Sequence, residues 1–306
     1  MSIRNFFAVI LSLLLLFSLV ACKTDAGLKE NPASDFTYEF SEDDQYAWIT
    51  QYIGTSKHVV IPSQIEGRTV VNLRGRDVDG FIQGVFQDTD VETVVIPKTV
   101  KVIGNRAFKD CSALSSVTIP KDSELHTISI LAFENCTALK TIPLENAENL
   151  KTIGTKAFYH CESIESIQFP SSLESVGLSA FSYCTSLKSV NIPTKLNLIE
   201  DLNGPRFSHV PALEEITFDE GWQELRGYVF FAISSGANIR LPQSVTAISV
   251  TFFGNAGTTV NLHFAGDCPQ LLDGTEFHGD VTIHYDPDTD GWDTTPLKDV
   301  HVLIPN

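Results

Sequence analysis

Four regularly spaced cysteines are the first residues of this sequence that could do chemistry. Each lies three positions after a phenylalanine, and they are Cys111, Cys136, Cys161 and Cys184. Such spacing places them in one column along a repeated structure, where they could ligate a metal or form redox pairs. A zinc site needs four ligands that converge on one point, whereas the outer members of a straight column lie three repeats apart. Parallel side chains in register also make disulfide bridges awkward, so we expect buried, inert thiols.

A run of alternating aspartates near the C terminus is the second candidate. It matches the opening of a calcium loop, D-x-D-x-D-G, in which alternate oxygens surround a hard cation. The residues are Asp286, Asp288, Asp290 and Gly291. The twelfth position of such a loop should be a bidentate Glu, and here it is Leu297. We therefore expect an acidic turn that leads to Trp292 and no metal site, with calcium as the weaker alternative.

The other polar residues form no recognisable catalytic motif. The 8 His residues occupy different phases of the repeat, and the chain has no nucleophile elbow, no H-E-x-x-H and no phosphate-binding glycine loop. Carboxylates are plentiful in so acidic a chain, and solvated surface positions explain them better than acid–base catalysis. We therefore expect neither an enzyme nor a cofactor.

The N-terminal segment predicts export. Arg4 gives it a positive start, and Phe6 to Ala21 is almost wholly apolar, as in a secretory signal. Its last residues through Cys22, LVAC, resemble a bacterial lipobox, so cleavage would remove residues 1–21 as a lipoprotein signal peptide and leave acyl chains on Cys22. Two or more acyl chains anchor a protein stably in a membrane. The alternatives are an ordinary signal peptide with a chance cysteine and a short membrane span.

The composition argues against nucleic-acid binding and against a disordered chain. Removing residues 1–21 takes away only Arg4 from the 21 basic and 38 acidic side chains, so the net charge becomes about −18. Nucleic-acid binding depends on clustered Lys and Arg that neutralise phosphates, so nucleic acid is not expected as a partner. A hydrophobic fraction of 43% with 20 phenylalanines is too rich for a disordered chain and indicates an extensive core.

The elements that position these residues follow from an internal repeat. The segment AFKDCSALSSVTIP returns as AFENCTALKTIPLE, AFYHCESIESIQFP and AFSYCTSLKSVNIP. Its phenylalanine recurs at Phe86, Phe108, Phe133, Phe158, Phe181, Phe207, Phe230, Phe253 and Phe277. Beyond Ile199 the units keep the apolar positions but lose the Cys and Gly. The phenylalanine column is therefore expected to be core.

Each unit contains a strand pattern, apolar-x-x-apolar-x-apolar-Pro. One example is Leu114, Val117, Ile119 and Pro120. Alternating Ile and Val fit a short strand with one buried face, and proline, which cannot donate to a ladder, ends the strand. Pro143 lies one place off this register, before the expected strand end at Leu144. The motif that follows the strand, as in Ile103-Gly104, predicts a turn, and the Ala-Phe segment predicts a short helical or irregular return.

Units of this size bury their apolar faces only against their neighbours, which predicts a solenoid. The expected fold class is a leucine-rich-repeat solenoid, with short parallel strands on the concave side and turns and short helical or irregular segments on the other. We expect a tether at 22–35, an N-terminal capping repeat at 36–80, the solenoid at 81–280 and a C-terminal capping segment at 281–306. Capped ends make a monomer the expected state.

The repeat unit IP…IG…AF…C…L resembles the BspA-like class of leucine-rich repeat, over most of residues 36–292. The leader YAWITQYIGTSKHVVIPSQIEGRTVVNL and the closing VTIHYDPDTDGW also resemble the terminal units of that family's surface lipoproteins. The resemblance implies a surface protein that adheres to host extracellular-matrix or plasma proteins, to other bacteria, or to both. It carries over no catalytic residues.

Exposed strand residues on the concave side form the expected binding surface. One column is short, polar and nearly uncharged, and another alternates opposite charges from Lys140 onward. The residues predicted to bind protein are Thr118, Lys140, Glu165, Gln168, Lys188, Asn191, Thr217, Arg240 and His263. The alternative is a surface salt-bridge ladder, in which each pair contributes about 0 to 1 kcal/mol. The segment RGRDVDGFIQG predicts a protruding loop, and loops on rigid scaffolds often carry contacts.

These patterns together predict an exported bacterial lipoprotein, anchored through Cys22 at the cell surface or outer membrane, whose solenoid binds macromolecules. The favoured role is an adhesin. The alternative is a structural or envelope-associated protein-interaction scaffold without a host ligand.

Overall fold

The computed structural model describes residues 28–196, 205–226, 229–233, 235–249, 259–272, 274, 280–299 and 301–305. The predicted signal peptide, the predicted lipid-attachment residue Cys22, and Phe253 and Phe277 lie outside the described residues. Within those ranges, no helix is long and apolar enough to cross a membrane.

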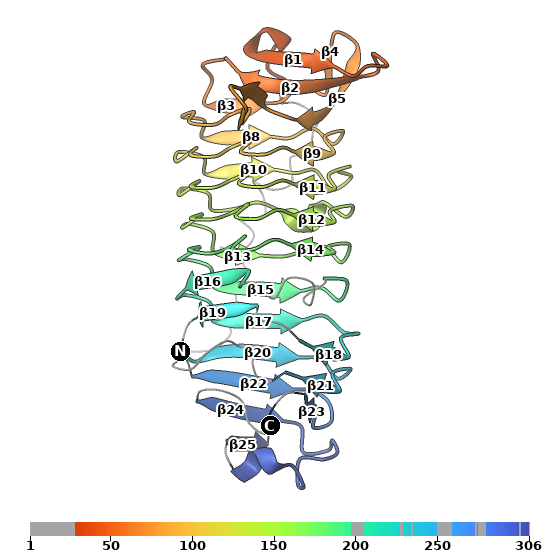
Figure 1. Ribbon diagram of the computed structural model, residues 1–306, viewed down its shortest axis with the longest axis vertical. Coiled ribbons are helices and arrows are strands. Elements are labelled where there is room, and N and C mark those ends of the chain that lie inside the picture. Colours follow the sequence, from red (N-terminus) through yellow and green to blue (C-terminus); the bar gives the residue numbers. More distant parts are fainter. Residues whose placement is uncertain are drawn as a thin grey trace, which may run out of the picture.

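The chain winds into a column of stacked turns (Figure 1). One face of the column, the strip face, carries the strands predicted from the apolar pattern, continued by two strands from the segment predicted as a C-terminal cap. These strands are β3 (His58–Val60), β8 (Thr93–Val95), β10 (Ser116–Thr118), β13 (Ser166–Ile167), β15 (Ser189–Ile192), β17 (Glu215–Phe218), β20 (Ala237–Leu241), β22 (Val260–Phe264), β24 (Val281–Tyr285) and β25 (Val302–Pro305). They form two parallel sheets, β3-β8-β10 and β13 through β25. The predicted repeat solenoid is therefore confirmed.

The strip face is interrupted at the repeat that contains Leu144. The apolar spacing predicts a strand there, but only an isolated bridge from Ser116 to Thr141 forms. Leu144–Asn146 is instead the 3-10 helix η2, which begins after Pro143. Proline has no N–H to donate to the ladder, and here it comes two positions earlier than in the neighbouring repeats, directly before the apolar residue Leu144 instead of after it. The strand prediction was wrong at this one repeat.

The Ile-Gly motif forms a second face of strands, whereas its pattern had predicted turns. The strands are β9 (Val102–Ile103), β11 (Thr127–Ile128), β12 (Thr152–Ile153), β14 (Ser175–Val176), β18 (Glu224–Leu225), β21 (Ala247–Ile248) and β23 (Gln270–Leu271). They also stack in parallel. The glycine is needed because successive turns approach closely. A Cβ at Gly104 would lie 2.3 Å from the carbonyl oxygen of Leu73.

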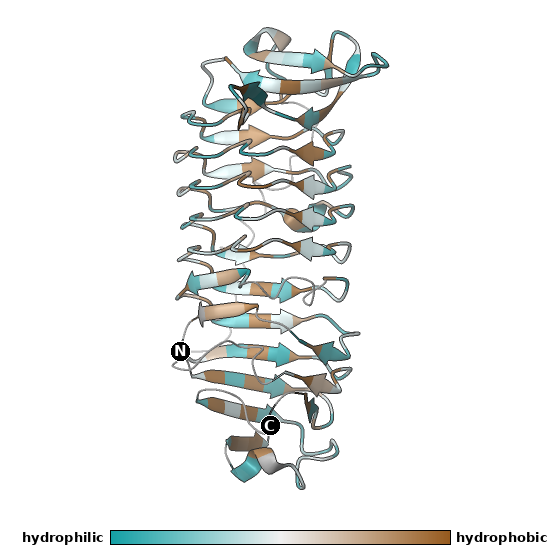
Figure 2. Cartoon of the chain, in the orientation of Figure 1, coloured by the Kyte–Doolittle hydropathy of each residue, from teal (hydrophilic) through white to brown (hydrophobic). Residues whose placement is uncertain are grey.

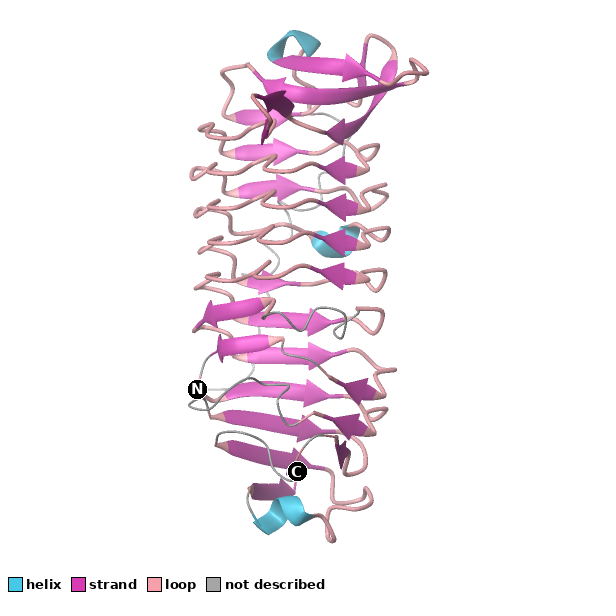
Figure 3. Cartoon of the chain, in the orientation of Figure 1, coloured by secondary structure: helices cyan, strands magenta, loops and turns pink. Residues whose placement is uncertain are grey.

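The Ala-Phe segments form turns on the third side, without the helices that the sequence had allowed. Helical structure in the described residues consists of η2 and two other 3-10 helices, η1 (Ala33–Asp35) and η3 (Pro296–Asp299) (Figure 3). The positions two before and two after the phenylalanine adopt positive φ, as at Ser179 (54°) and Tyr183 (63°). This left-handed pair, uncommon for residues other than glycine, reverses the chain around Phe181. In later repeats the same segment becomes β16 (Phe207–Val210) and β19 (Phe230–Ile233).

The phenylalanine column is the core, as predicted. From Phe86 to Phe230 its seven described rings are at most 1% exposed. The first five stack face to face, with successive ring centroids 4.8, 4.9, 5.0 and 5.0 Å apart. Such burial of large aromatic side chains dominates the energetics of a core.

Four strands close the N-terminal end of the column: β1 (Phe36–Phe40), β2 (Tyr46–Tyr52), β4 (Gln64–Ile65) and β5 (Arg68–Leu73). β1 runs antiparallel to β2, which pairs in parallel with β5, and β5 pairs with β9. Phe36 and Tyr52 pack on Phe86 and so cover the first ring of the core.

The end of the predicted tether is attached to this body. The Asn31 amide donates to the carbonyl oxygen of Val60 at 2.8 Å, and Asn31 Oδ1 accepts from the Val60 amide at 2.9 Å. The backbone amide of Ser63 donates to Glu30 Oε1 at 3.0 Å. Residues 30–35 are therefore part of the folded body and not of a free tether.

The segment predicted as a C-terminal cap continues the sheet. β24 pairs in parallel with β22, and β25 pairs in parallel with β24. Between these strands, Trp292 and Leu297 are buried against the core. A capping role for residues 281–306 stays a prediction, while the backbone of this segment adds two more rungs to the strip face.

Candidate functional site

The polar strip is the outward side of the strip face, and it contains the nine residues predicted to bind protein. The strand register joins four of them in one continuous column, in the order Asn191, Thr217, Arg240 and His263. Glu165 and Gln168 flank β13, and Lys188 precedes β15. Figure 2 shows the apolar and polar residues alternating along β20, β22 and β24, which is how these strands bury one face and expose the other.

The polar strip is not continuous toward the N terminus. Thr118 lies in the separate sheet β3-β8-β10, beside Val95. Lys140 lies at the interrupted repeat, where its backbone amide donates to Ser115 at 2.9 Å and the Thr141 carbonyl accepts from Val117 at 3.4 Å. These two predicted residues are therefore set apart from the Asn191–His263 column.

The structure adds His284 to this column, because β24 pairs with β22 and places His284 beside His263. Sequence reasoning missed His284 because it assigned the segment from 281 onward to a cap. The alternating residues Val281, Ile283 and Tyr285 repeat the pattern of the preceding strands, and this signal could have extended the column.

The predicted charge ladder forms only in part. Lys188 lies 3.0 Å from Glu165 across β13 and β15. Lys140 takes part in none of the ion pairs of the described residues. Arg240 instead pairs with Glu215 on the adjacent strand. The charges of the polar strip are thus arranged as separate local pairs.

The two imidazoles of the polar strip lie face to face. Their centroids are 4.4 Å apart with an interplanar angle of 13°. Nε2 of His263 lies 3.0 Å from Asn238 Oδ1. Desolvation lowers the pKa of His263 below its ordinary value, and His284 and Arg240 lower it further. The neutral imidazole is therefore favoured in the free protein.

A groove of about 450 Å³ opens beside these side chains. It is lined by Arg240, Leu241, His263, Phe264, Ala265 and Asp286. Small-molecule sites commonly have volumes of about 300 to 1,000 Å³ and combine apolar walls with a few polar groups. The volume of the groove lies in this range, and Arg240, His263 and Asp286 supply polar groups.

The segment RGRDVDGFIQG forms an exposed hairpin of β6 (Arg76–Val78) and β7 (Phe81–Gln83). Asp79 and Gly80 at its tip both have positive φ, 54° and 82°, as a tight type I′ turn requires. Asp77 Oδ1 accepts a hydrogen bond of 2.8 Å from the Gly80 amide. The loop predicted to protrude is therefore a well-ordered hairpin.

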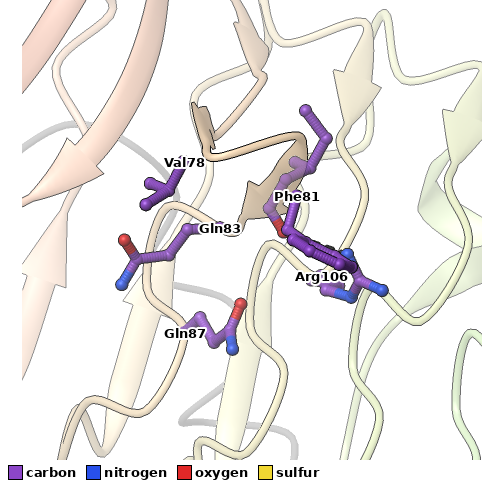
Figure 4. A pocket seen from close by; sticks show the side chains of 6 residues that line it. Val78, Phe81, Gln83, Gln87 and Arg106 are labelled. Carbon is purple, nitrogen blue, oxygen red and sulfur yellow. Dashed lines mark hydrogen bonds between the residues drawn. The ribbon is translucent and has the colours of Figure 1, made fainter.

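This hairpin holds two exposed apolar side chains above the neighbouring turn. Phe81 is 72% exposed and pairs across the hairpin with Val78. Figure 4 shows both residues with Gln83, next to Gln87 and Arg106 of the column, around a pocket of about 280 Å³. Arg106 donates to the Ile82 carbonyl at 3.1 Å and fixes the base of the hairpin. The hairpin therefore presents Phe81 as an exposed aromatic side chain on a tight turn.

The four column cysteines are free and buried. Each thiol donates to the carbonyl of a phenylalanine in the preceding repeat, as from Cys111 to Phe86 at 2.9 Å and from Cys161 to Phe133 at 3.1 Å. Burial raises the pKa of Cys111 to about 11 and that of Cys184 to about 12. Since the thiolate is the reactive form, this arrangement suits structural hydrogen bonds and not catalysis.

The aspartate segment is a turn. The Asp288 amide donates to Asp286 Oδ1 at 3.0 Å, and the Asp290 amide donates to Asp267 Oδ1 at 2.8 Å. Trp292 Nε1 donates to the Gly266 carbonyl at 3.3 Å and so packs the turn onto the preceding repeat. Across the described residues, His, Cys, Asp and Glu side chains form no group suited to a metal ion.

The repeat geometry agrees with a family model of six copies, the BspA type leucine-rich repeat region, at residues 81–203 and 151–273. These spans together cover more than half of the chain. The chain belongs to the BspA-type leucine-rich repeat family. A BspA-type solenoid is a stacked repeat scaffold whose extended surfaces suit the binding of proteins.

Two solved structures show the same fold. A leucine-rich repeat protein from T. pallidum is 29% identical with a TM-score of 0.55, and the match covers 67% of this chain and 86% of that chain. A leucine-rich repeat protein from Bacteroides ovatus is 20% identical with a TM-score of 0.50, and the match covers 92% and 76% of the two chains. No curated protein matches the chain.

Proposed function

We propose that this BspA-type protein is a bacterial cell-surface lipoprotein that acts as an adhesin for host extracellular-matrix or plasma proteins, or for other bacteria. The observation that carries the proposal is the hairpin with Phe81, a large apolar side chain that is 72% exposed on a tight turn. Burying an exposed phenylalanine against a partner is strongly favourable, and a preordered hairpin loses little entropy on binding.

The polar strip supports the same proposal, because it offers a partner a long row of hydrogen-bonding side chains. Thr217, Asn191 and Gln168 are uncharged, and they lie between the local ion pairs of Lys188 and Arg240. Interfaces of this kind combine an apolar anchor with a polar surround. Membrane attachment through acyl chains on Cys22 would present both surfaces outside the cell, with the chain as a monomer.

The first test concerns location. Protease is added to intact cells that express the wild-type chain or Cys22→Ala. We expect rapid digestion of the wild-type protein and release of the variant into the medium, because loss of the acyl chains removes the anchor. Full protection of the wild-type protein would overturn the adhesin and favour an envelope-associated scaffold.

The second test concerns the surface. Binding of the purified protein to immobilised fibronectin, laminin and fibrinogen is measured for wild type, Phe81→Ala and Ile130→Ala. Ile130 is a matched control, since it is an exposed apolar residue on a different turn. We expect Phe81→Ala to weaken binding by about tenfold or more, as for an interface anchor, while Ile130→Ala has no effect. Equal binding by all three would remove the hairpin from the interface.

A further inference from the structure

Arg240, His263 and His284 meet at the C-terminal end of the polar strip. They occupy equivalent positions on β20, β22 and β24, and the three strands lie side by side in Figure 1. The two imidazoles stack at 4.4 Å, and Arg240 and His263 both line the groove of about 450 Å³. The three residues bring basic side chains together in a chain with a net charge of −17.

The charged groups that face His263 come from every strand packed against it. Arg240 lies on one side and His284 on the other, Glu215 accepts from Arg240 Nε, and Asp286 lines the same groove. Asn238 Oδ1 is an acceptor, so its contact assigns the hydrogen to Nε2 of His263. No described residue forms a hydrogen bond with Nδ1 of His263, which is therefore open to a ligand.

Protonation of His263 would place a positive charge beside the Arg240 guanidinium. That state is unfavourable in the empty groove, and the lowered pKa of His263 has this cause in part. An anion bound in the groove would reverse the balance, because a nearby opposite charge favours the protonated imidazole. Binding of an anion is thus coupled to proton uptake, and its affinity must rise as the pH falls.

The remaining walls specify what else the ligand contains. Asp286 already accepts from the Asp288 amide through Oδ1 and has further lone pairs for hydroxyl donors. The ligand that fits has a carboxylate for Arg240 and His263 and hydroxyl groups for Asp286. A sugar acid has both. An acidic peptide would instead bring further carboxylates toward Asp286 and Glu215, and would be repelled by them.

We propose that the groove lined by Arg240, His263 and Asp286 binds a carboxylate-bearing sugar, and binds it more tightly at acidic than at neutral pH. The inference goes beyond the proposed adhesin and does not depend on it, since a protein that fails to bind any matrix protein would still bind the sugar acid.

Isothermal titration calorimetry of the full chain with glucuronate tests the proposal at about pH 7.5 and about pH 5.5, on either side of the ordinary histidine pKa. We expect the association constant to rise by about tenfold or more at the lower pH, in line with uptake of at least one proton. The methyl ester of glucuronic acid, which lacks the charge, should bind at least about tenfold more weakly at the lower pH.

Variants separate the roles of the three residues. His284→Gln keeps a polar side chain and should reduce the pH dependence, whereas Arg240→Gln should weaken binding at both pH values. Lys151→Gln is the control, since Lys151 pairs with Glu174 beside the second face and should leave binding unchanged. Circular dichroism checks that each variant keeps its fold. Absence of glucuronate binding, equal binding of the ester, pH-independent binding, or tighter binding of an aspartate-rich peptide would each overturn the proposal.

Discussion

The regular half of the solenoid, residues 81–196, and its irregular half, residues 205–305, hold the same fold together in different ways. In the regular half the core phenylalanines stack within 9° of parallel. In the irregular half, Phe207 and Phe230 stack at 25° and 5.3 Å. The thiol hydrogen bonds of the column cysteines belong to the regular half alone among the described residues. Identical side chains therefore fix the register of one half.

In the irregular half, backbone pairing contributes more to fixing the register of the strands. β13 has two residues and β10 has three, whereas β20, β22 and β24 have five each. β20 begins one position earlier than β17, because Ala237 takes the position that Glu214 occupies one repeat earlier. Val260 of β22 pairs with Ala237, and both residues are buried and apolar. The comparison teaches that a solenoid can lose its repeat signature where longer strands replace it.

The largest expected effect on stability comes from removing one core phenylalanine ring from each half. Phe133→Ala leaves a gap between two parallel rings and should lower the free energy of unfolding by about 3 to 5 kcal/mol. Phe230→Ala should cost less, because its ring is stacked less closely and its repeat is held by longer strands. Urea denaturation followed by circular dichroism measures both. Equal costs would show that the two halves depend on the column to the same extent.

The thiol ladder gives the next largest effect. Cys161→Ala removes one of two donors to the Phe133 carbonyl, which still accepts from the Cys136 amide, and should lower the free energy of unfolding by about 0.5 to 1.5 kcal/mol. Cys268→Ala is the matched control in the irregular half, where the thiol is half-buried and outside the column; it should change stability by less than about 0.5 kcal/mol. Thermal unfolding of both variants measures the difference. If Cys161→Ala destabilises the protein no more than Cys268→Ala, the thiol hydrogen bonds contribute nothing to stability.

A smaller effect of opposite sign is expected at a left-handed turn position. Ser179 has φ 54°, and its side chain makes no hydrogen bond among the described residues. Glycine relieves about 1 to 2 kcal/mol of left-handed strain and adds about 0.4 to 1 kcal/mol of unfolded-state entropy. Ser179→Gly should therefore stabilise the regular half slightly. Ser189→Gly, in strand β15, should destabilise it, and a melting temperature lowered by both changes would contradict the assignment of strain.

The smallest effect concerns the polar strip. Lys188 and Glu165 are 3.0 Å apart, with side chains 55% and 62% exposed. A double-mutant cycle with Lys188→Ala and Glu165→Ala should give a coupling of at most about 0.5 kcal/mol, because water screens exposed pairs. The coupling should vanish in high salt. A larger, salt-resistant value would indicate that the pair helps to set the register of β13 and β15.

Much of the fold could be predicted because repetition exposes the core directly. The Phe and Cys columns, the parallel stacking and the column from Asn191 to His263 all follow from residues that recur at a fixed spacing. The predicted lipid attachment at Cys22 and the adhesin role stay predictions. The strands at the Ile-Gly motif could not be recognised, since two residues carry too little pattern to separate a strand from a turn.

The sequence by itself determined which side chains face inward, because burial of a repeated apolar set leaves one consistent way to stack the turns. Only the tertiary structure decided which surface groups meet. Lys140 is set apart because Pro143 breaks its strand, Arg240 pairs with Glu215, and His284 joins His263 because β24 extends the sheet. Inward positions are fixed by local alternation, whereas contacts between exposed side chains depend on the register of neighbouring strands, which one unit of sequence does not contain.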